Sequence, residues 1–223
     1  MPKVLKGYPN LMKLNLDATD AKEYSMGSII IDSPTLRSVS LRAVGKSDDW
    51  VRVSEKCEKL KDFSMINTRK KQLELLAPNV ERVHIEGLNE YDPADLIIAA
   101  DNGYLLHLQR TVVHIENCKG VGKLVIDDNW SGERDPFTAD KKPNAYSNLH
   151  YYEGRRQAQY HNAFFHNFAL SAPRLVRLHL HFNEHLRFEN EPGGDDILHI
   201  KHPNLEWVNL INGDEFFRGI KID

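Results

Sequence analysis

The stretches "PRLVRLHL" (residues 173–180) and "PNLEWVNL" (203–210) share one pattern: a proline followed by apolar residues at the third, sixth and eighth positions. Written as L-x-x-L-x-L, with any aliphatic or aromatic residue accepted, the pattern occurs seven times, at residues 11–16, 36–41, 60–65, 80–85, 121–126, 175–180 and 205–210. In five copies a proline stands two residues before the first apolar position: Pro9, Pro34, Pro78, Pro173 and Pro203. Proline ends the preceding element and favours an extended backbone beside it, so each of these prolines marks a turn into a strand.

The spacing of the copies predicts a repeat architecture. The first four copies begin at residues 11, 36, 60 and 80. The intervals between these starts lie within the 20 to 29 residue range of short solenoid repeats. Each copy places two apolar side chains on one side of a short strand, because neighbouring side chains of a strand alternate between its faces. One such unit cannot enclose a core, so the units must stack. The sequence therefore predicts a single solenoid domain over residues 1–223.

Several of the segments between the strands are predicted to be helical. These are residues 49–60, 68–78 and 92–108, and the last begins with Asp-Pro in cap-like positions. The predicted fold class is α/β, with a curved parallel sheet on the concave side and helices and irregular turns on the convex side. Residues 129–162 interrupt the repeat with a polar, proline-containing and aromatic stretch, which is interpreted as an insertion.

Several copies resemble a known family. The stretches "YPNLMKLNLDATD" (8–20), "SPTLRSVSLRAVG" (33–45) and "APNVERVHIEGLN" (77–89) look like irregular leucine-rich repeats of the kind found in F-box proteins. The resemblance implies a leucine-rich-repeat solenoid that recruits proteins. The chain departs from the family where the repeat normally has asparagine or cysteine, a position filled here by Thr19, Val44, Thr68 and Leu88.

Residues 111–128 allow two interpretations. They contain two template-like strands that end at Ile115 and Ile126, only 11 residues apart. Either these are two strands of the solenoid, or they form a β-hairpin that turns at residues 119–122, where Gly120 and Gly122 supply backbone freedom.

The side chains between the apolar positions are expected to form a binding face on the concave sheet, since curved solenoids offer extended surfaces to partners. The candidate binding residues are Arg82, His84, Glu86, His114, Glu116, Arg177, His179, His181 and Trp207, and the insertion contributes Trp130. Tryptophan and arginine are the side chains that most often anchor protein interfaces. The sequence therefore predicts a non-enzymatic recognition module for a protein partner.

Composition excludes several other classes. With 29 basic and 32 acidic residues the net charge is −3, so nucleic acid is not an expected partner. The apolar runs are too short for a membrane, and two cysteines far apart indicate reduced thiols and a cytoplasmic location.

Neither a metal site nor a catalytic motif is supported by the sequence. His84, Glu86, His114 and Glu116 could supply zinc ligands, but no HExxH or CxxC motif is present, and no metal or other cofactor is expected. Catalytic motifs are also missing from the sequence. The competing hypothesis is a β-helical enzyme that acts on carbohydrate with carboxylates from adjacent strands; the predicted helices count against it.

Overall fold

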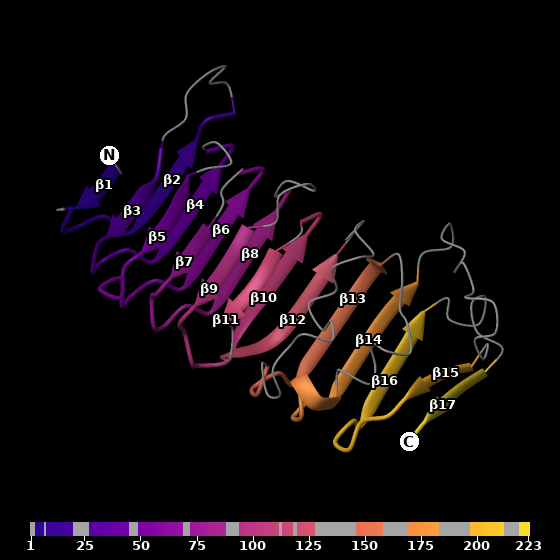
Figure 1. Ribbon diagram of the computed structural model, residues 1–223. Helices are drawn as coiled ribbons and strands as arrows, with labels where there is room; N and C mark the ends of the chain where they lie inside the picture. The colour runs from indigo at the N-terminus through magenta and orange to yellow at the C-terminus, as the bar shows by residue number, and fades with distance from the viewer. Residues whose placement is uncertain are drawn as a thin grey trace.

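A computed structural model describes residues 3–6, 8–19, 27–44, 49–68, 72–87, 94–111, 113–117, 120–127, 146–157, 169–182, 197–211 and 219–223 (Figure 1). Two parallel sheets make up most of it. The six-stranded sheet consists, in order, of β1 (Lys3–Lys6), β3 (Ile29–Asp32), β5 (Trp50–Val53), β7 (Gln72–Leu75), β9 (Ala94–Ile98) and β11 (Val113–Asn117). The nine-stranded sheet consists, in order, of β2 (Lys13–Asp17), β4 (Ser38–Arg42), β6 (Asp62–Ile66), β8 (Arg82–Glu86), β10 (Tyr104–Gln109), β12 (Val121–Asp127), β13 (Tyr151–Gln157), β14 (Arg177–Phe182) and β16 (Trp207–Ile211). A separate pair joins β15 (Ile197–Ile200) to β17 (Gly219–Ile222).

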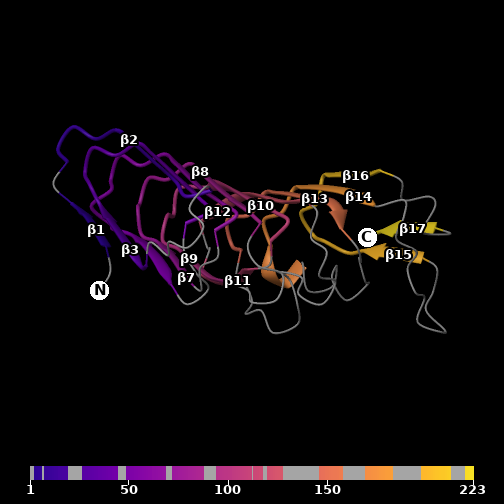
Figure 2. The same cartoon turned by 90° about the horizontal axis from the view of Figure 1, so that it is seen from above.

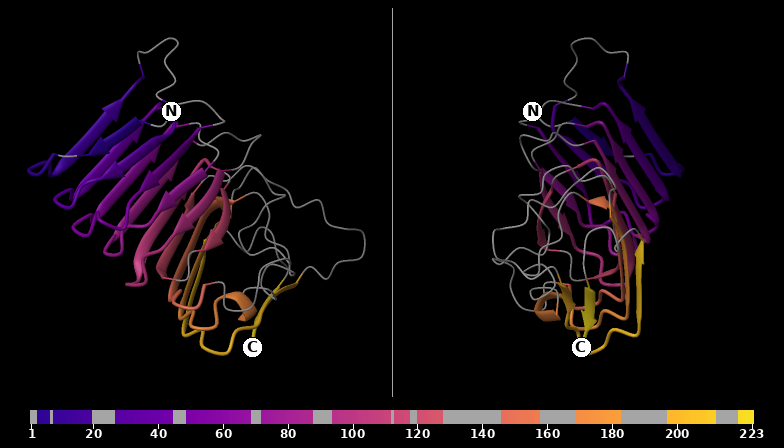
Figure 3. Two further views of the ribbon diagram at one scale, coloured as in Figure 1. Left: turned by 60° about the vertical axis from the view of Figure 1, so that its left-hand side comes forward. Right: turned by 90° about the vertical axis from the view of Figure 1, so that its right-hand side faces the viewer.

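From β1 to β12 the chain alternates between the two sheets, and each strand from β1 to β10 pairs in parallel with the strand two places later in the sequence. Each turn therefore contributes one strand to each sheet, and the result is a parallel β-solenoid of about 5 turns. Figure 2 shows the two layers from above, and Figure 3 follows the strands from the indigo N-terminal end to the yellow C-terminal end. The solenoid predicted from the repeats is confirmed.

The predicted helices are wrong. Residues 49–60 contain β5, residues 68–78 contain β7, and residues 92–108 contain β9 and most of β10. Among the described residues, helical conformation is confined to 169–171. The fold is therefore a two-sheet β-solenoid and not an α/β leucine-rich-repeat structure. In "WVRV" and "QLEL" every second residue is buried, which is the period of a strand, but runs this short do not distinguish strand from helix in the sequence.

The apolar positions of the repeated pattern fill the space between the sheets. Stacked neighbours in the nine-stranded sheet form one continuous inner row: Val39, Phe63, Val83, Leu106, Leu124, Tyr152 and Leu178, all at most 1% exposed. The six-stranded sheet covers this row with its own aliphatic residues, which include Ile29, Val51 and Leu73. One core thus runs along the solenoid, as the stacking argument requires.

The prolines of the pattern occupy the corners that lead into the nine-stranded sheet. Four of these corners are closed β-turns. In each, the residue directly before the proline accepts a hydrogen bond from the N–H of the residue two places after the proline. The bonds run from Leu11 to Tyr8 (3.1 Å), Leu36 to Ser33 (3.4 Å), Leu175 to Ala172 (3.1 Å) and Leu205 to His202 (3.5 Å). Proline suits the second position of such a turn because its φ is already fixed near the required value. The turns predicted at Pro9, Pro34, Pro173 and Pro203 are confirmed.

The opposite corners follow a different rule. The residue after the strand has a positive φ in four successive turns, at Ala43 (51°), Asn67 (48°), Gly87 (66°) and Arg110 (46°). Each of the four donates its N–H to a carbonyl of the following strand in the nine-stranded sheet, at 2.8–3.0 Å. The acceptor is always the last residue of that strand. The residue that follows turns inward, and Val44, Thr68 and Thr111 are buried. Val44 and Thr68, which stand where a leucine-rich repeat would have asparagine or cysteine, are therefore inward-facing corner residues of this solenoid.

The hairpin interpretation of residues 111–128 is wrong, and the two-strand interpretation is confirmed. The strand β11 pairs with β9 in the six-stranded sheet, whereas β12 pairs with β10 and β13 in the nine-stranded sheet. Gly120 is needed for close approach between turns, since a Cβ there would lie 1.8 Å from the carbonyl oxygen of Ala100.

The expected insertion at 129–162 also needs correction, because residues 151–157 form β13 inside the nine-stranded sheet. Tyr146 and Tyr152, assigned to that insertion, belong to the core. In the described part of the chain, no helix is long and apolar enough to cross a membrane.

Candidate binding face

The outward-pointing side chains of the nine-stranded sheet form three parallel columns, which together we call the outer face. The first column contains Lys13, Ser38, Asp62, Arg82, Leu105, Lys123, Tyr151, Arg177 and Trp207. The middle column contains Asn15, Ser40, Ser64, His84, His107, Val125, Glu153, His179 and Asn209. The third column contains Asp17, Arg42, Ile66, Glu86, Gln109, Asp127, Arg155, His181 and Ile211. Parallel in-register pairing keeps each column straight, so residues far apart in the sequence become neighbours.

A histidine pair lies near the middle of this face. His84 on β8 and His107 on β10 have their Nδ1 atoms 3.1 Å apart and their ring centroids 4.7 Å apart. His84 Nε2 lies 3.5 Å from Glu86 Oε2, and the guanidinium of Arg110 binds the other oxygen of Glu86. When neutral His84 donates from Nε2 to Glu86, its Nδ1 is free to accept the Nδ1 proton of His107. That arrangement leaves His107 Nε2 as a bare acceptor, and this atom is buried with no hydrogen-bond partner among the described residues.

Burial and charge set the protonation of this cluster. Burial, reinforced by the neighbouring His84, lowers the pKa of His107, so the ring is neutral at pH 7. Burial acts to raise the pKa of Glu86, but hydrogen bonds from Arg110 and His84 outweigh it, and the pKa is lowered overall. The cluster therefore holds an ionised carboxylate on Glu86 and a neutral imidazole on His107.

A second cluster lies on β12 and β13. Glu153 is only 7% exposed, accepts hydrogen bonds from Arg155 Nε (2.6 Å) and the hydroxyl of Tyr151 (3.0 Å), and is ionised. Burial acts to raise its pKa, but these two hydrogen bonds outweigh the effect and the pKa is lowered. Arg155 also reaches Asp127 on the neighbouring strand at 3.7 Å, and Lys123 lies 4.2 Å from the centroid of the Tyr151 ring. Each buried charge on this part of the face is thus paired, as stability requires.

Beyond this cluster the face is more exposed. Trp207 on β16 is 42% exposed, and its ring lies 6.0 Å from that of His179 on β14. Arg177 stands beside Trp207 in the first column and is exposed as well. Ile211 in the third column is 37% exposed. An aromatic ring and a guanidinium therefore lie exposed side by side on the last two strands of the outer face, and the aliphatic side chain of Ile211 is exposed at the other end of β16.

The structure places most of the sequence-predicted residues on this one face: Arg82, His84, Glu86, Arg177, His179, His181 and Trp207. His114 and Glu116 do not join them, because β11 belongs to the six-stranded sheet. The zinc site considered for His84, Glu86, His114 and Glu116 is therefore split between two sheets. Trp130 lies outside the described residues.

Three residues of the outer face, His107, Glu153 and Arg155, were not among the candidates predicted from the sequence. His107 was hidden in a segment predicted as helix, and Glu153 and Arg155 in the supposed insertion. The signal was the alternation of "YLLHLQ", in which Tyr104, Leu106 and Leu108 point inward and His107 points outward. Within the described residues, no three His, Cys, Asp or Glu side chains are grouped so that they could hold a metal ion.

Comparisons with family models, with curated proteins and with solved structures found no match to this chain. The resemblance to leucine-rich repeats therefore extends only to a solenoid of parallel strands.

Proposed function

We propose that this chain is a non-enzymatic recognition module that binds a protein partner through the outer face of the nine-stranded sheet. The observation that carries the proposal is the exposed group at its C-terminal end, where Trp207 is 42% exposed beside Arg177 and His179. Large amphipathic rings and arginines dominate the energetics of protein interfaces when a partner covers them.

The rest of the outer face suits a protein surface of mixed charge. Acidic and basic side chains alternate along it in pairs, such as Asp62 with Arg82 and Glu153 with Arg155. These pairs fix the side chains before binding, which reduces the entropy lost on association. Because the charges cancel locally, the face offers no continuous positive surface to a phosphate backbone.

A reducing cellular location is part of the same proposal. Cys57 is a buried free thiol, and burial raises its pKa, so the reactive thiolate is disfavoured.

A second candidate is a carbohydrate-active enzyme. The predicted helices that counted against it are strands in the described structure, and one observation on the outer face favours it. Asp127 and Glu153 stand on adjacent strands, and both contact Arg155. A glycosidase needs one carboxylic acid that stays protonated to protonate the leaving group. The lowered pKa of Glu153 makes it a poor general acid, which is why recognition is the preferred proposal.

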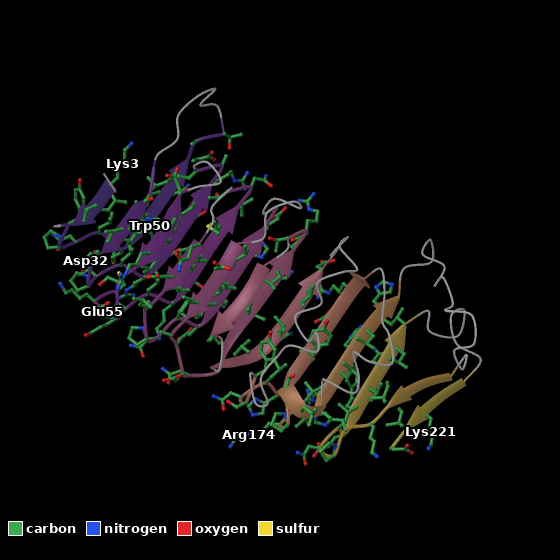
Figure 4. All side chains as sticks on the ribbon, viewed as in Figure 1. Lys3, Asp32, Trp50, Glu55, Arg174 and Lys221 are labelled. Carbon is green, nitrogen blue, oxygen red and sulfur yellow. The ribbon has the colours of Figure 1, made fainter. Side chains whose placement is uncertain are left out.

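Matched substitutions on the two sheets test the recognition proposal. Trp207→Ala and Arg177→Ala alter the outer face, whereas Trp50→Ala and Arg52→Ala make the same changes on the outward side of the six-stranded sheet (Figure 4 labels Trp50). Proteins captured on immobilised wild type are identified, and a purified candidate is titrated against each variant by calorimetry. We expect Trp207→Ala and Arg177→Ala each to weaken binding by at least about 1 kcal/mol, with no change for the two controls. Binding that responds to Trp50 or Arg52 but not to Trp207 or Arg177 would show that the other sheet is the working surface.

The enzyme candidate has its own test. The protein is incubated with neutral and acidic polysaccharides, and the release of reducing ends is measured for wild type and Glu153→Gln. We expect no turnover by either protein. Turnover that is lost in Glu153→Gln would favour the enzyme.

A further inference from the structure

Among the residues that the structure describes, the first turn of the solenoid leaves part of its core uncovered. In the described part of the chain, β2 pairs only with β4 and β1 only with β3, so both strands lie at open sheet edges (Figure 1; Figure 4 labels Lys3 on β1). Leu14 and Leu16 on β2 are half-buried, whereas Val39 and Leu41, their partners on β4, are at most 1% exposed. Covering this end would bury the apolar surface that the first turn leaves in contact with water.

The hydrogen bonds of β2 show which backbone groups are open. The carbonyl of Met12 accepts from the N–H of Arg37 (2.8 Å), and the N–H of Ala18 donates to the carbonyl of Arg42 (3.0 Å), so both residues face β4. The N–H and C=O of one residue point to the same side of a strand, and the side alternates from residue to residue. Lys13, Asn15 and Asp17 therefore direct their N–H and C=O groups toward the open edge.

We propose that β2 pairs antiparallel with β2 of a second copy of this chain, around a two-fold axis at Asn15. In this register Asn15 faces Asn15 of the other copy, and Lys13 faces Asp17 of the other copy. All the residues with open backbone groups then meet as hydrogen-bonded pairs, which an antiparallel sheet requires. The nine-stranded sheets of the two copies join into one continuous sheet.

Side chains support the same register on both sides of the strand. On the outer side, the two-fold axis creates two identical Lys13–Asp17 pairs of opposite charge. On the inner side, Leu14 faces Leu16 of the other copy, which extends the core across the interface. Asp17 is ionised because hydrogen bonds from the hydroxyl and the N–H of Thr19 lower its pKa. Both of those bonds reach Oδ1, so Thr19 does not occupy Oδ2.

The charge pattern selects a second copy in the antiparallel orientation. In the strand Lys13-Leu14-Asn15-Leu16-Asp17, opposite charges stand at equal distances from the centre, so the strand is complementary to itself only when reversed. Parallel in-register pairing would instead place Lys13 beside Lys13 and Asp17 beside Asp17, which is unfavourable.

Charge reversal tests the register in the chain of 223 residues. Lys13→Asp gives a strand with two acidic ends, and Asp17→Lys gives one with two basic ends. We expect wild type to form a dimer at high micromolar concentration in sedimentation velocity, and each single variant to raise the dimer dissociation constant about tenfold or more. An equimolar mixture of the two variants should recover the dimer, because acidic ends then face basic ends. The double variant Lys13→Asp/Asp17→Lys should dimerise like wild type.

Lys123→Asp on the outer face of β12 is the control and should leave the dimer unchanged. Recovery in the mixture also shows that both single variants are folded. A monomeric wild type at the same concentration, or single variants that dimerise as wild type does, would overturn the proposal. Failure of the mixture to recover the dimer would overturn it as well.

Discussion

Two adjacent leucines of β10 provide a matched test of the fold. Leu106 is 0% exposed and stacks between Val83 of β8 and Leu124 of β12, whereas Leu105 is partly exposed on the outer face. The same change, leucine to alanine, at the two positions therefore removes a core side chain in one case and a surface side chain in the other.

The expected cost of Leu106→Ala is in the upper half of the range for buried leucines, about 3–5 kcal/mol of unfolding free energy. The reason is that the neighbouring strands cannot collapse into the cavity, since hydrogen bonds to β8 and β12 hold β10 on both sides. Leu105→Ala removes less buried apolar surface and leaves no closed cavity. We therefore expect it to lower the unfolding free energy by less than about 1.5 kcal/mol. For a chain of this length the difference of about 1.5–5 kcal/mol corresponds to a gap in Tm of roughly 3–20 °C.

Urea unfolding followed by circular dichroism measures both variants, with the m-value as a check that the same surface is exposed on unfolding. Equal losses of stability, or a larger loss for Leu105→Ala, would refute the strand register at β10. They would also revive a helix over 92–108, in which the two leucines would not alternate between core and surface.

Two further predictions concern the corner glycine and the histidine pair. Gly120→Ala should lower the unfolding free energy by about 1–3 kcal/mol, because its Cβ would lie 1.8 Å from the backbone oxygen of Ala100. Gly122→Ala, where the nearest atom is 3.1 Å away, should cost less in the same urea assay. The pKa of His107 is lowered in the folded protein by burial and by His84, so the unfolded chain takes up this proton first as the pH falls below about 6.5. Wild type should therefore lose more stability than His107→Gln between about pH 7.5 and pH 5, and equal losses would show that the ring is not held neutral by the fold.

The candidate binding face was predictable where the repeat is regular. Arg82, His84, Arg177 and Trp207 are found by counting from the apolar positions of each copy, because strand alternation fixes which side chains point outward. Glu153 was not predictable in this way. Its strand, "YYEGRRQ", carries Tyr152 and Gly154 at the inward positions that the structure describes, in place of the aliphatic pair that marks the other copies.

The sequence by itself determined the solenoid, the inward positions of seven strands and the proline turns that lead into them. These features depend on interactions within a few residues: the alternation of side chains, the fixed φ of proline and the need of each short apolar strand for a neighbour. Only the tertiary structure decided that the return segments are strands and that β11 and β12 belong to different sheets. A four-residue run such as "QLEL" has no preference strong enough to choose its own conformation, and the parallel strands β5 and β9 on either side of it make it a strand. The tertiary structure also placed His107 beside His84 and Asp127 beside Arg155. The two members of each pair are distant in the sequence, and the register of the stacked turns makes them neighbours.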